Sequence, residues 1–280
     1  MEKNQKTAKK ATVIKKSKPK EIPAKKETVK KEAEPKLVIP TPEEMLEAGV
    51  HFGHQVKRWN PTMAPFIYGK KSNIHILDLF KTEQRLREAC EFLYKTAVAG
   101  ETIIFIGTKR QAQVVLKESA EKSGALYMTN RWLGGTLTNF VEIKKNIEKL
   151  KDLSRQKKEG ELDHYTKKEQ LLIDREIRRL TFMVGGIISM KKLPAAVFIV
   201  DVKKEKTAYR EAVRTGVKIV SLSDTNNDIS KVDYPIPGND DAMKAISLIV
   251  KTVAGAVELG YNQYERDSIK GQMSKGKSQK

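Results

Sequence analysis

Four short apolar runs predict β-strands, at 102–106, 125–128, 196–200 and 217–222. Their hydrophobicity is continuous rather than alternating, which is typical of strands buried on both faces of a parallel sheet. Helical patterns alternate with these runs, at 82–99, 111–122, 206–215 and 242–259. The pattern therefore predicts an α/β fold with right-handed crossovers.

The last helical segment has clear expected ends. Asn239 is a suitable N-cap, and Asp240 and Asp241 suit the positive end of a helix. Gly260 follows the last predicted turn, where glycine commonly terminates a helix. We therefore expect this helix to stop at Gly260.

One segment, 139–185, interrupts the alternation of strands and helices. Its apolar residues recur every three or four positions in two series: Ile143, Ile147 and Leu150, then Ile173, Ile177, Leu180 and Val184. This spacing predicts an antiparallel pair of helices joined by a polar turn near Gly160. The helices could pack flat on the sheet. The narrow apolar seam and the charged flanks favour a coiled-coil hairpin that protrudes from the α/β domain.

The net charge of +19 lies mostly at the ends of the chain. The first 36 residues hold 13 Lys and five Glu with little apolar mass, which predicts a disordered arm over 1–40. A second basic tail is expected at 263–280. The α/β domain then comprises 41–138 and 186–262. The tails could serve as solvated tethers or bind RNA backbone directly. The surplus of positive charge suggests an extended anionic partner, nucleic acid before membrane. No run approaches the ~18 apolar residues of a membrane span.

Polar residues follow the predicted strands, where doubly wound folds bind ligands. Gly107-Thr108-Lys109-Arg110, Asp201 and Asp224 could form a nucleotide site, which keeps an α/β enzyme as the alternative function. However, the chain has neither a G-x-G-x-x-G motif after a strand nor a Walker spacing. We interpret the two acids as turn or cap residues, and expect Lys109 and Arg110 to meet RNA phosphate.

Two further groups of residues bear on metal binding and catalysis. His51 and His54 lie three apart, but a structural zinc site needs four ligands, so we expect no metal. The two histidines could hydrogen-bond locally or contact RNA, and we assign both to RNA contact. No nucleophile stands beside a base in a known motif, and a single cysteine, Cys90, excludes an internal disulfide. We therefore predict no catalytic residue and no cofactor.

Basic and aromatic residues are interleaved in two places, a mixture that suits RNA phosphates and bases. The first group contains Lys57, Arg58, Trp59, Asn60, Lys70 and Lys71. The second contains Asn130, Arg131 and Trp132. For the second group the alternative is equally open: Trp132 could be a core aromatic, and Gly134-Gly135 could simply turn the chain into the hairpin.

Several of these blocks together resemble the bacterial-type small ribosomal subunit protein two family. The resemblance is carried by 45–54, Arg58-Trp59-Asn60-Pro61, 73–79, 107–109, 130–140, Leu193-Pro194, 224–226 and 234–241. It runs in order from about residue 41 to about residue 260. The loop Asp201-Val202-Lys203-Lys204-Glu205-Lys206 departs from the family pattern, and the lysine-rich arm is not part of it.

The resemblance implies a Rossmann-like (flavodoxin-like) domain with a coiled-coil hairpin, in a non-enzymatic constituent of the small ribosomal subunit. Its implied partners are small-subunit rRNA and neighbouring ribosomal proteins, including the mRNA-binding OB-fold ribosomal protein one, whose docking it supports. The implied location is the cytoplasmic ribosome of a bacterial-type system. Neither a membrane partner nor a homo-oligomer is expected.

Overall fold

The computed structural model describes residues 37–162 and 164–277, which belong to one compact unit. The predicted arm over 1–40 lies almost entirely outside the described residues. Among the described residues, no helix is both long and apolar enough to cross a membrane.

Five parallel strands form the central sheet, in the order β5-β4-β6-β7-β8. Their bounds are β4 (Ile103–Ile106), β5 (Leu126–Met128), β6 (Ala196–Val200), β7 (Lys218–Ser223) and β8 (Tyr234–Pro237). Numbered along the chain, this order is 2-1-3-4-5, as in flavodoxin-like doubly wound folds. The four predicted strands are confirmed. The fifth, β8, was not predicted because Pro235 and Pro237 suggest a rigid turn, but proline is tolerated at a sheet edge.

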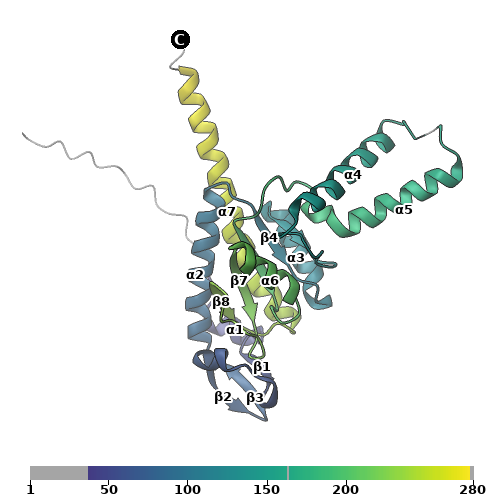
Figure 1. Ribbon diagram of the computed structural model, residues 1–280. Helices are drawn as coiled ribbons and strands as arrows, with labels where there is room; N and C mark the ends of the chain where they lie inside the picture. The colour runs from purple at the N-terminus through teal and green to yellow at the C-terminus, as the bar shows by residue number, and fades with distance from the viewer. Residues whose placement is uncertain (1–36, 163, 278–280) are drawn as a thin grey trace, which may run out of the picture. The chain divides into compact units, whose positions relative to one another are not determined.

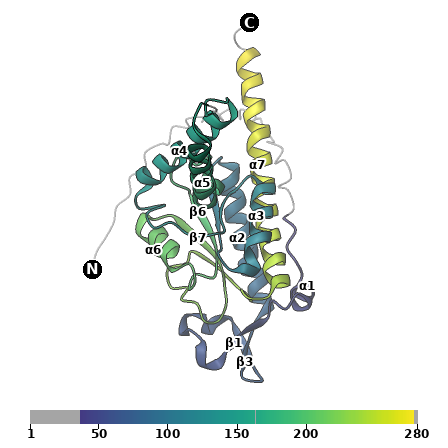
Figure 2. The same cartoon turned by 90° about the vertical axis from the view of Figure 1, so that its right-hand side faces the viewer.

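Helices cover both faces of this sheet, which explains its unbroken hydrophobicity. Alternate residues of β4 point to opposite cores: Ile103 and Phe105 to one, Ile104 and Ile106 to the other. The first core is completed by α2 (Leu79–Val98), α3 (Arg110–Ser123) and α7 (Met243–Lys277). The second lies under α6 (Lys206–Thr215), which Figure 2 places on the opposite side of the sheet.

The last helix does not end where the sequence predicted. α7 runs on to Lys277, through most of the segment expected to be a tail. Gly260 is not a helix terminus but a point of close helix–helix approach: a Cβ there would lie 2.5 Å from Ala97 Cβ and 2.7 Å from the Tyr94 carbonyl oxygen. The hydroxyl of Tyr261 also donates to the Glu101 carbonyl oxygen, at 2.9 Å. The prediction failed because a glycine required by packing looks like a helix cap in sequence.

Two glycines of α7 should respond oppositely to alanine. Gly260→Ala should lower the free energy of unfolding by about 1–3 kcal/mol, because the added methyl overlaps α2. Gly255→Ala, whose added Cβ has no atom within 4 Å beyond the neighbouring backbone of its own helix, should raise it by about 1 kcal/mol through helix propensity. Urea unfolding of both variants measures this difference, and a stabilised Gly260→Ala would contradict the packing argument.

The segment 139–185 folds as α4 (Phe140–Lys158) and α5 (Lys167–Val184), followed by the short 3₁₀ helix η3 (Gly185–Ile187). Ion pairs join the two helices at Lys149–Glu176 (2.8 Å) and Lys157–Asp174 (2.6 Å), so they run antiparallel, as Figure 1 shows. Part of the apolar seam also belongs to the second core, including Ile147. The base of the pair is therefore built into the domain, and its coiled-coil character stays a prediction.

A second, smaller sheet was not predicted at all. It consists of β1 (Phe52–Gln55), β3 (Ile74–Leu77) and β2 (Ile67–Lys71), all antiparallel, in that spatial order. The helix α1 (Pro42–Glu47) precedes it, and the 3₁₀ helices η1 (Val56–Arg58) and η2 (Pro61–Phe66) connect β1 to β2. The backbone amide of Asn60 donates to the Thr225 carbonyl oxygen at 2.7 Å. This bond ties the small sheet to the carboxyl end of the main sheet. Figure 1 shows β1, β2 and β3 at the lower end of the molecule.

Candidate nucleic-acid interface

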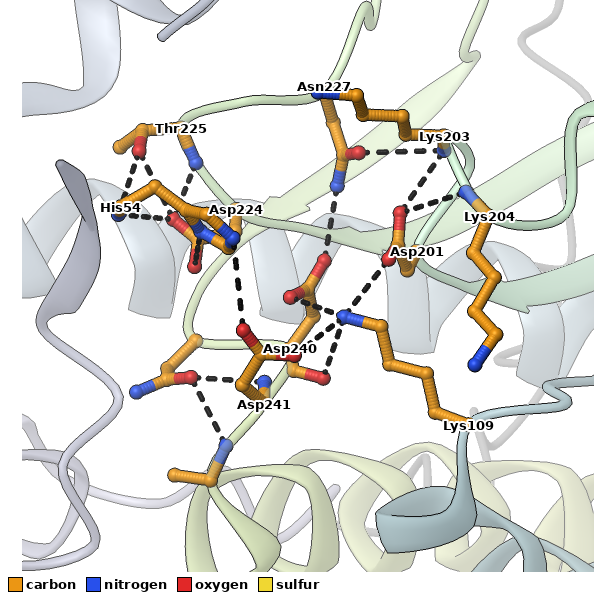
Figure 3. A network of polar contacts seen from close by, with 12 residues as sticks. His54, Lys109, Asp201, Lys203, Lys204, Asp224, Thr225, Asn227, Asp240 and Asp241 are labelled. Atoms are coloured by element: carbon orange, nitrogen blue, oxygen red, sulfur yellow. Dashed lines mark hydrogen bonds and ion pairs between the residues drawn. The ribbon is translucent and has the colours of Figure 1, made fainter. Parts of the chain in front are cut away.

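The switch point of the main sheet lies between β4 and β6, where a doubly wound fold usually binds a nucleotide. Here the side chain of Lys109 fills that position (Figure 3). Its Nζ lies 2.8 Å from Asp201, 2.7 Å from Asp240 and 2.8 Å from Asp241. Lys109 is only 6% exposed, so its ammonium group is already neutralised and is not presented to a phosphate.

Backbone geometry holds the acids of this network in place. Asp201 has a φ of 67°, an unusual left-handed conformation, and its Oδ1 accepts hydrogen bonds from the backbone amides of Lys203 and Lys204. Asp240 Oδ2 accepts from Asn227 Nδ2 at 3.1 Å. The interpretation of Asp201 as a turn acid is therefore confirmed. What the sequence could not reveal is that the same carboxylate also pairs with Lys109.

His54 extends the network towards the small sheet (Figure 3). Its Nδ1 lies 2.6 Å from Asp224 Oδ2, and its backbone amide donates to the Thr225 hydroxyl at 2.9 Å. The hydrogen bond to Asp224 raises the pKa of His54. His51 does not join this network, and burial lowers its pKa. The two histidines that are neighbours in sequence therefore have different surroundings.

Burial and neighbouring charges act against each other on the pKa of Lys109 but act together on the pKa of Asp240. Burial alone would lower the pKa of Lys109, but the carboxylates of Asp240 and Asp201 raise it above its ordinary value. Burial, reinforced by the charge of Asp201, raises the pKa of Asp240 to about 7. His54, Asp224 and Asp240 could also supply one nitrogen and two oxygen ligands to a metal ion, with ligand atoms within 4.8 Å of one another. Lys109 already serves as a cation for Asp240.

Exposed cations and aromatic rings gather on the small sheet instead. Trp59 is 42% exposed and lies over His75, with ring centroids 5.5 Å apart, and Tyr68 is 81% exposed. Ser72 and Asn73, both with positive φ, form the two-residue turn between β2 and β3. This turn places two adjacent lysines at the tip of a hairpin. Four exposed cations form no ion pair with any described residue: Lys57, Arg58, Lys70 and Lys71.

Buried polar atoms that lack a partner lie in the same region. Among the described side chains these are His51 Nδ1, His75 Nδ1, His75 Nε2 and Asn226 Oδ1. His75 is on β3, and Asn226 is in the loop beneath Asn60. Buried polar groups are normally hydrogen-bonded, so these atoms are unused hydrogen-bonding positions close to the exposed cations.

The second predicted group is only partly exposed. Trp132 is a core aromatic, 7% exposed, and its Nε1 donates to Glu211 at 3.2 Å, in agreement with the alternative interpretation. Asn130 and Arg131 are exposed, and Asn130 Nδ2 donates to the Phe182 carbonyl oxygen at 2.9 Å. Arg110 is exposed at the start of α3. Asn130 and Arg131 follow β5, and Arg110 begins α3, so these residues come from other elements than the small sheet.

The geometry thus defines an α/β protein in which its own Lys109 occupies the usual nucleotide position, and in which four exposed, unpaired cations lie on or next to an added small sheet. The family described as Ribosomal protein S2 matches residues 45–260. The small ribosomal subunit protein uS2 of Bdellovibrio bacteriovorus is 47% identical over 225 residues, covering 80% of this chain and 72% of that protein. The uS2 of Treponema pallidum is 45% identical over 228 residues, covering 81% and 78%.

A third relative, uS2c of Rhodomonas salina, is 46% identical over 226 residues, covering 81% of this chain and 93% of that protein. The chain belongs to the ribosomal protein S2 family. It is accordingly a structural, non-enzymatic ribosomal protein.

Proposed function

We propose that this chain is a constituent of the small ribosomal subunit that binds rRNA through the small sheet. The observation that carries the proposal is the set of unpaired cations beside exposed Trp59 and Tyr68. Lysine and arginine neutralise phosphates, and aromatic rings offer stacking surfaces to unpaired bases. The names of the relatives support the assembly into the small subunit, and hence a location in the ribosome of a bacterial-type cytoplasm.

The proposed interface contains fewer residues than the sequence indicated. It comprises Lys57, Arg58, Trp59, Asn60, Lys70 and Lys71, with the partly exposed His51 and His54 close to them in sequence. Lys109 and Trp132 are buried and already have partners, which argues against their direct contact with RNA. Arg110, Asn130 and Arg131 are accessible on other parts of the surface and could make separate contacts.

Removing two charges from the hairpin tip should weaken the salt dependence of rRNA binding. For Lys70→Gln/Lys71→Gln, the slope of log K against log salt should fall in magnitude by about 1.5, because each phosphate contact contributes roughly 0.7–0.9. The measurement is filter binding of the full chain to protein-free small-subunit rRNA at several salt concentrations.

The matched control is Lys95→Gln/Lys122→Gln, which removes two exposed lysines from the last turns of α2 and α3. These turns lead into the amino ends of β4 and β5, whereas the small sheet is tied to the carboxyl end of the main sheet. This control should leave the slope unchanged. Equal slope changes in the two double variants would mean that rRNA binding depends on net charge alone, and would contradict the proposed interface.

We further propose that α4 and α5 support the docking of the mRNA-binding ribosomal protein one. An apolar surface near the distal end favours this: Leu171 and Leu172 on α5 are 46% and 53% exposed. Replacing residues 154–173 by a short Gly-Ser turn should abolish capture of purified ribosomal protein one, while rRNA binding persists. The shortened chain keeps Leu150 and Leu180, which belong to the second core. A full-length Leu171→Ser/Leu172→Ser variant serves as the matched test, and undiminished capture by both variants would reject this role.

A further inference from the structure

A cavity of about 310 Å³ lies beside the start of α6. Its lining includes three cations, Lys203, Lys206 and Arg210, together with Tyr209, Asn60 and Asn226. Asn60 directly follows the exposed Trp59, so the cavity adjoins the proposed rRNA interface. None of the lining side chains belongs to the ion-pair network that fills the switch point.

The lining attracts an anion. The three cations are exposed and form no ion pair with any described residue. One carboxylate, of Asp228, also lines the cavity, and its Oδ1 accepts from the Ser230 amide. The nearby Glu205 carboxylate accepts from the amide and hydroxyl of Thr108, so it does not cap the first amides of α6. Positive charge therefore dominates the entrance, where a phosphate group would be bound.

The same cavity contains groups that recognise a base. Tyr209 is a half-buried aromatic residue, and aromatic rings stack on unpaired bases. The amide of Asn226 carries both a donor and an acceptor, and its buried Oδ1 has no hydrogen-bond partner. By contrast, the neighbouring Asn227 amide is bound at both ends, to Asp240 and to the Lys203 amide. Asn226 Oδ1 is thus an acceptor that no described residue uses, on a side chain that lines the cavity.

We infer that this cavity holds one unstacked nucleotide of an RNA strand. The inference rests on the proposed rRNA binding and adds a specific pocket to it. About 310 Å³ is at the small end of ligand sites, which range over roughly 300–1,000 Å³, and suits a single nucleotide. An RNA strand is favoured over a free nucleotide because the phosphate-binding groups are exposed side chains rather than an enclosed glycine-rich loop. They also continue the basic surface of the small sheet.

The test compares the full chain bound to two RNA probes, a fully paired stem and the same stem with one bulged adenosine. The bulged stem should bind about tenfold more tightly, since stacking of one base on an aromatic ring gives roughly 5- to 150-fold in affinity. Tyr209→Leu, which keeps apolar packing, and Asn226→Ala should both reduce this ratio towards one. Arg214→Gln is the control, because it removes an exposed charge one turn further along α6. Arg214→Gln should lower the affinity for both stems equally and leave the ratio of the two affinities unchanged.

Failure of this inference is distinguishable from failure of rRNA binding. If the wild-type chain binds rRNA with a steep salt dependence but binds both stems equally, the pocket is refuted while the proposed function stands. AMP provides the second arm. It should not displace the bulged stem at micromolar concentrations, and displacement there would assign the cavity to a free nucleotide and overturn the proposal.

Discussion

Lys109→Met should lower the free energy of unfolding by about 3–5 kcal/mol, because removing one partner of a buried charge network leaves the others uncompensated. Asp201 and Asp240 would remain in the interior, 6% and 0% exposed, without their cation. Methionine preserves most of the volume of the lysine stem, so the loss reports on charge rather than on a cavity. Urea unfolding of the two proteins at pH 7 measures the difference.

The loss of stability caused by Lys109→Met should depend on pH. The pKa of Asp240 is already about 7 because of burial, and loss of the Lys109 ammonium would raise it further. A carboxyl whose pKa is raised in the folded state binds protons more readily when folded, so stability is lost as pH rises from about 4 through that raised value. The defect should therefore be smaller at pH 5.5 than at pH 8.5. Lys109→Met/Asp240→Asn should recover part of the loss at pH 8.5.

Lys117→Ala is the matched control for this experiment. Lys117 forms a single ion pair with Glu121, at 3.9 Å, and both side chains are 52% exposed. Exposed pairs contribute about 0–1 kcal/mol, so this variant should be nearly neutral at every pH. A Lys109→Met protein as stable as this control would mean that Lys109 is not needed to compensate the buried acids.

Glu211→Ala should destabilise the protein by about 3–5 kcal/mol, since each orphaned buried donor costs roughly 1–3 kcal/mol. The Glu211 carboxylate on α6 accepts hydrogen bonds from Trp132 Nε1 at 3.2 Å, Gly135 N at 2.8 Å and Leu137 N at 3.0 Å. These donors form the loop that leads into α4. The loss should appear both in urea unfolding and as faster amide hydrogen exchange at residues 135–138.

Two further variants separate the role of this carboxylate from a general effect of substitution. Glu211→Gln retains one acceptor oxygen and should lose less stability than Glu211→Ala. Glu118→Ala, at an exposed position of α3, should change stability by less than about 0.5 kcal/mol. Unchanged exchange at 135–138 in Glu211→Ala would show that the loop does not depend on Glu211.

The core of the fold could be predicted because its signal is local. Strands β4, β6 and β7 are buried on both faces, so each appears as an unbroken apolar run whatever its neighbours are. The small sheet has no such signal. β1 reads Phe-Gly-His-Gln and is only partly buried, and it is held in place by contacts with residues about 170 positions away, such as Asp224 and Thr225. The propensities of the β1 residues do not reveal those long-range contacts, so the strand could not be predicted from the local sequence.

The candidate site shows the same limit. Lys109 follows a strand and begins a helix, so its sequence context favours phosphate binding, and only the fold reveals that three carboxylates surround it. Trp132 stands beside Arg131, yet its indole is directed to Glu211, 79 positions away. In contrast, Trp59 and the adjacent basic residues are exposed as expected. The residues beside the proposed nucleotide pocket on α6 were not singled out because nothing local joins them to Asn60.

The insertion of α4 and α5 between β5 and β6 has a consequence for synthesis of the chain. β4 is an inner strand of the sheet, between β5 and β6, but β6 begins about 90 residues after β4 ends. At roughly 5–20 residues per second, about 5–20 s pass before β6 is translated. During this interval one edge of β4 has no strand to pair with, and α7, which completes the first core, is made later still. The nascent protein must therefore pass through a stage with an open, apolar sheet edge, when association with other chains competes with folding.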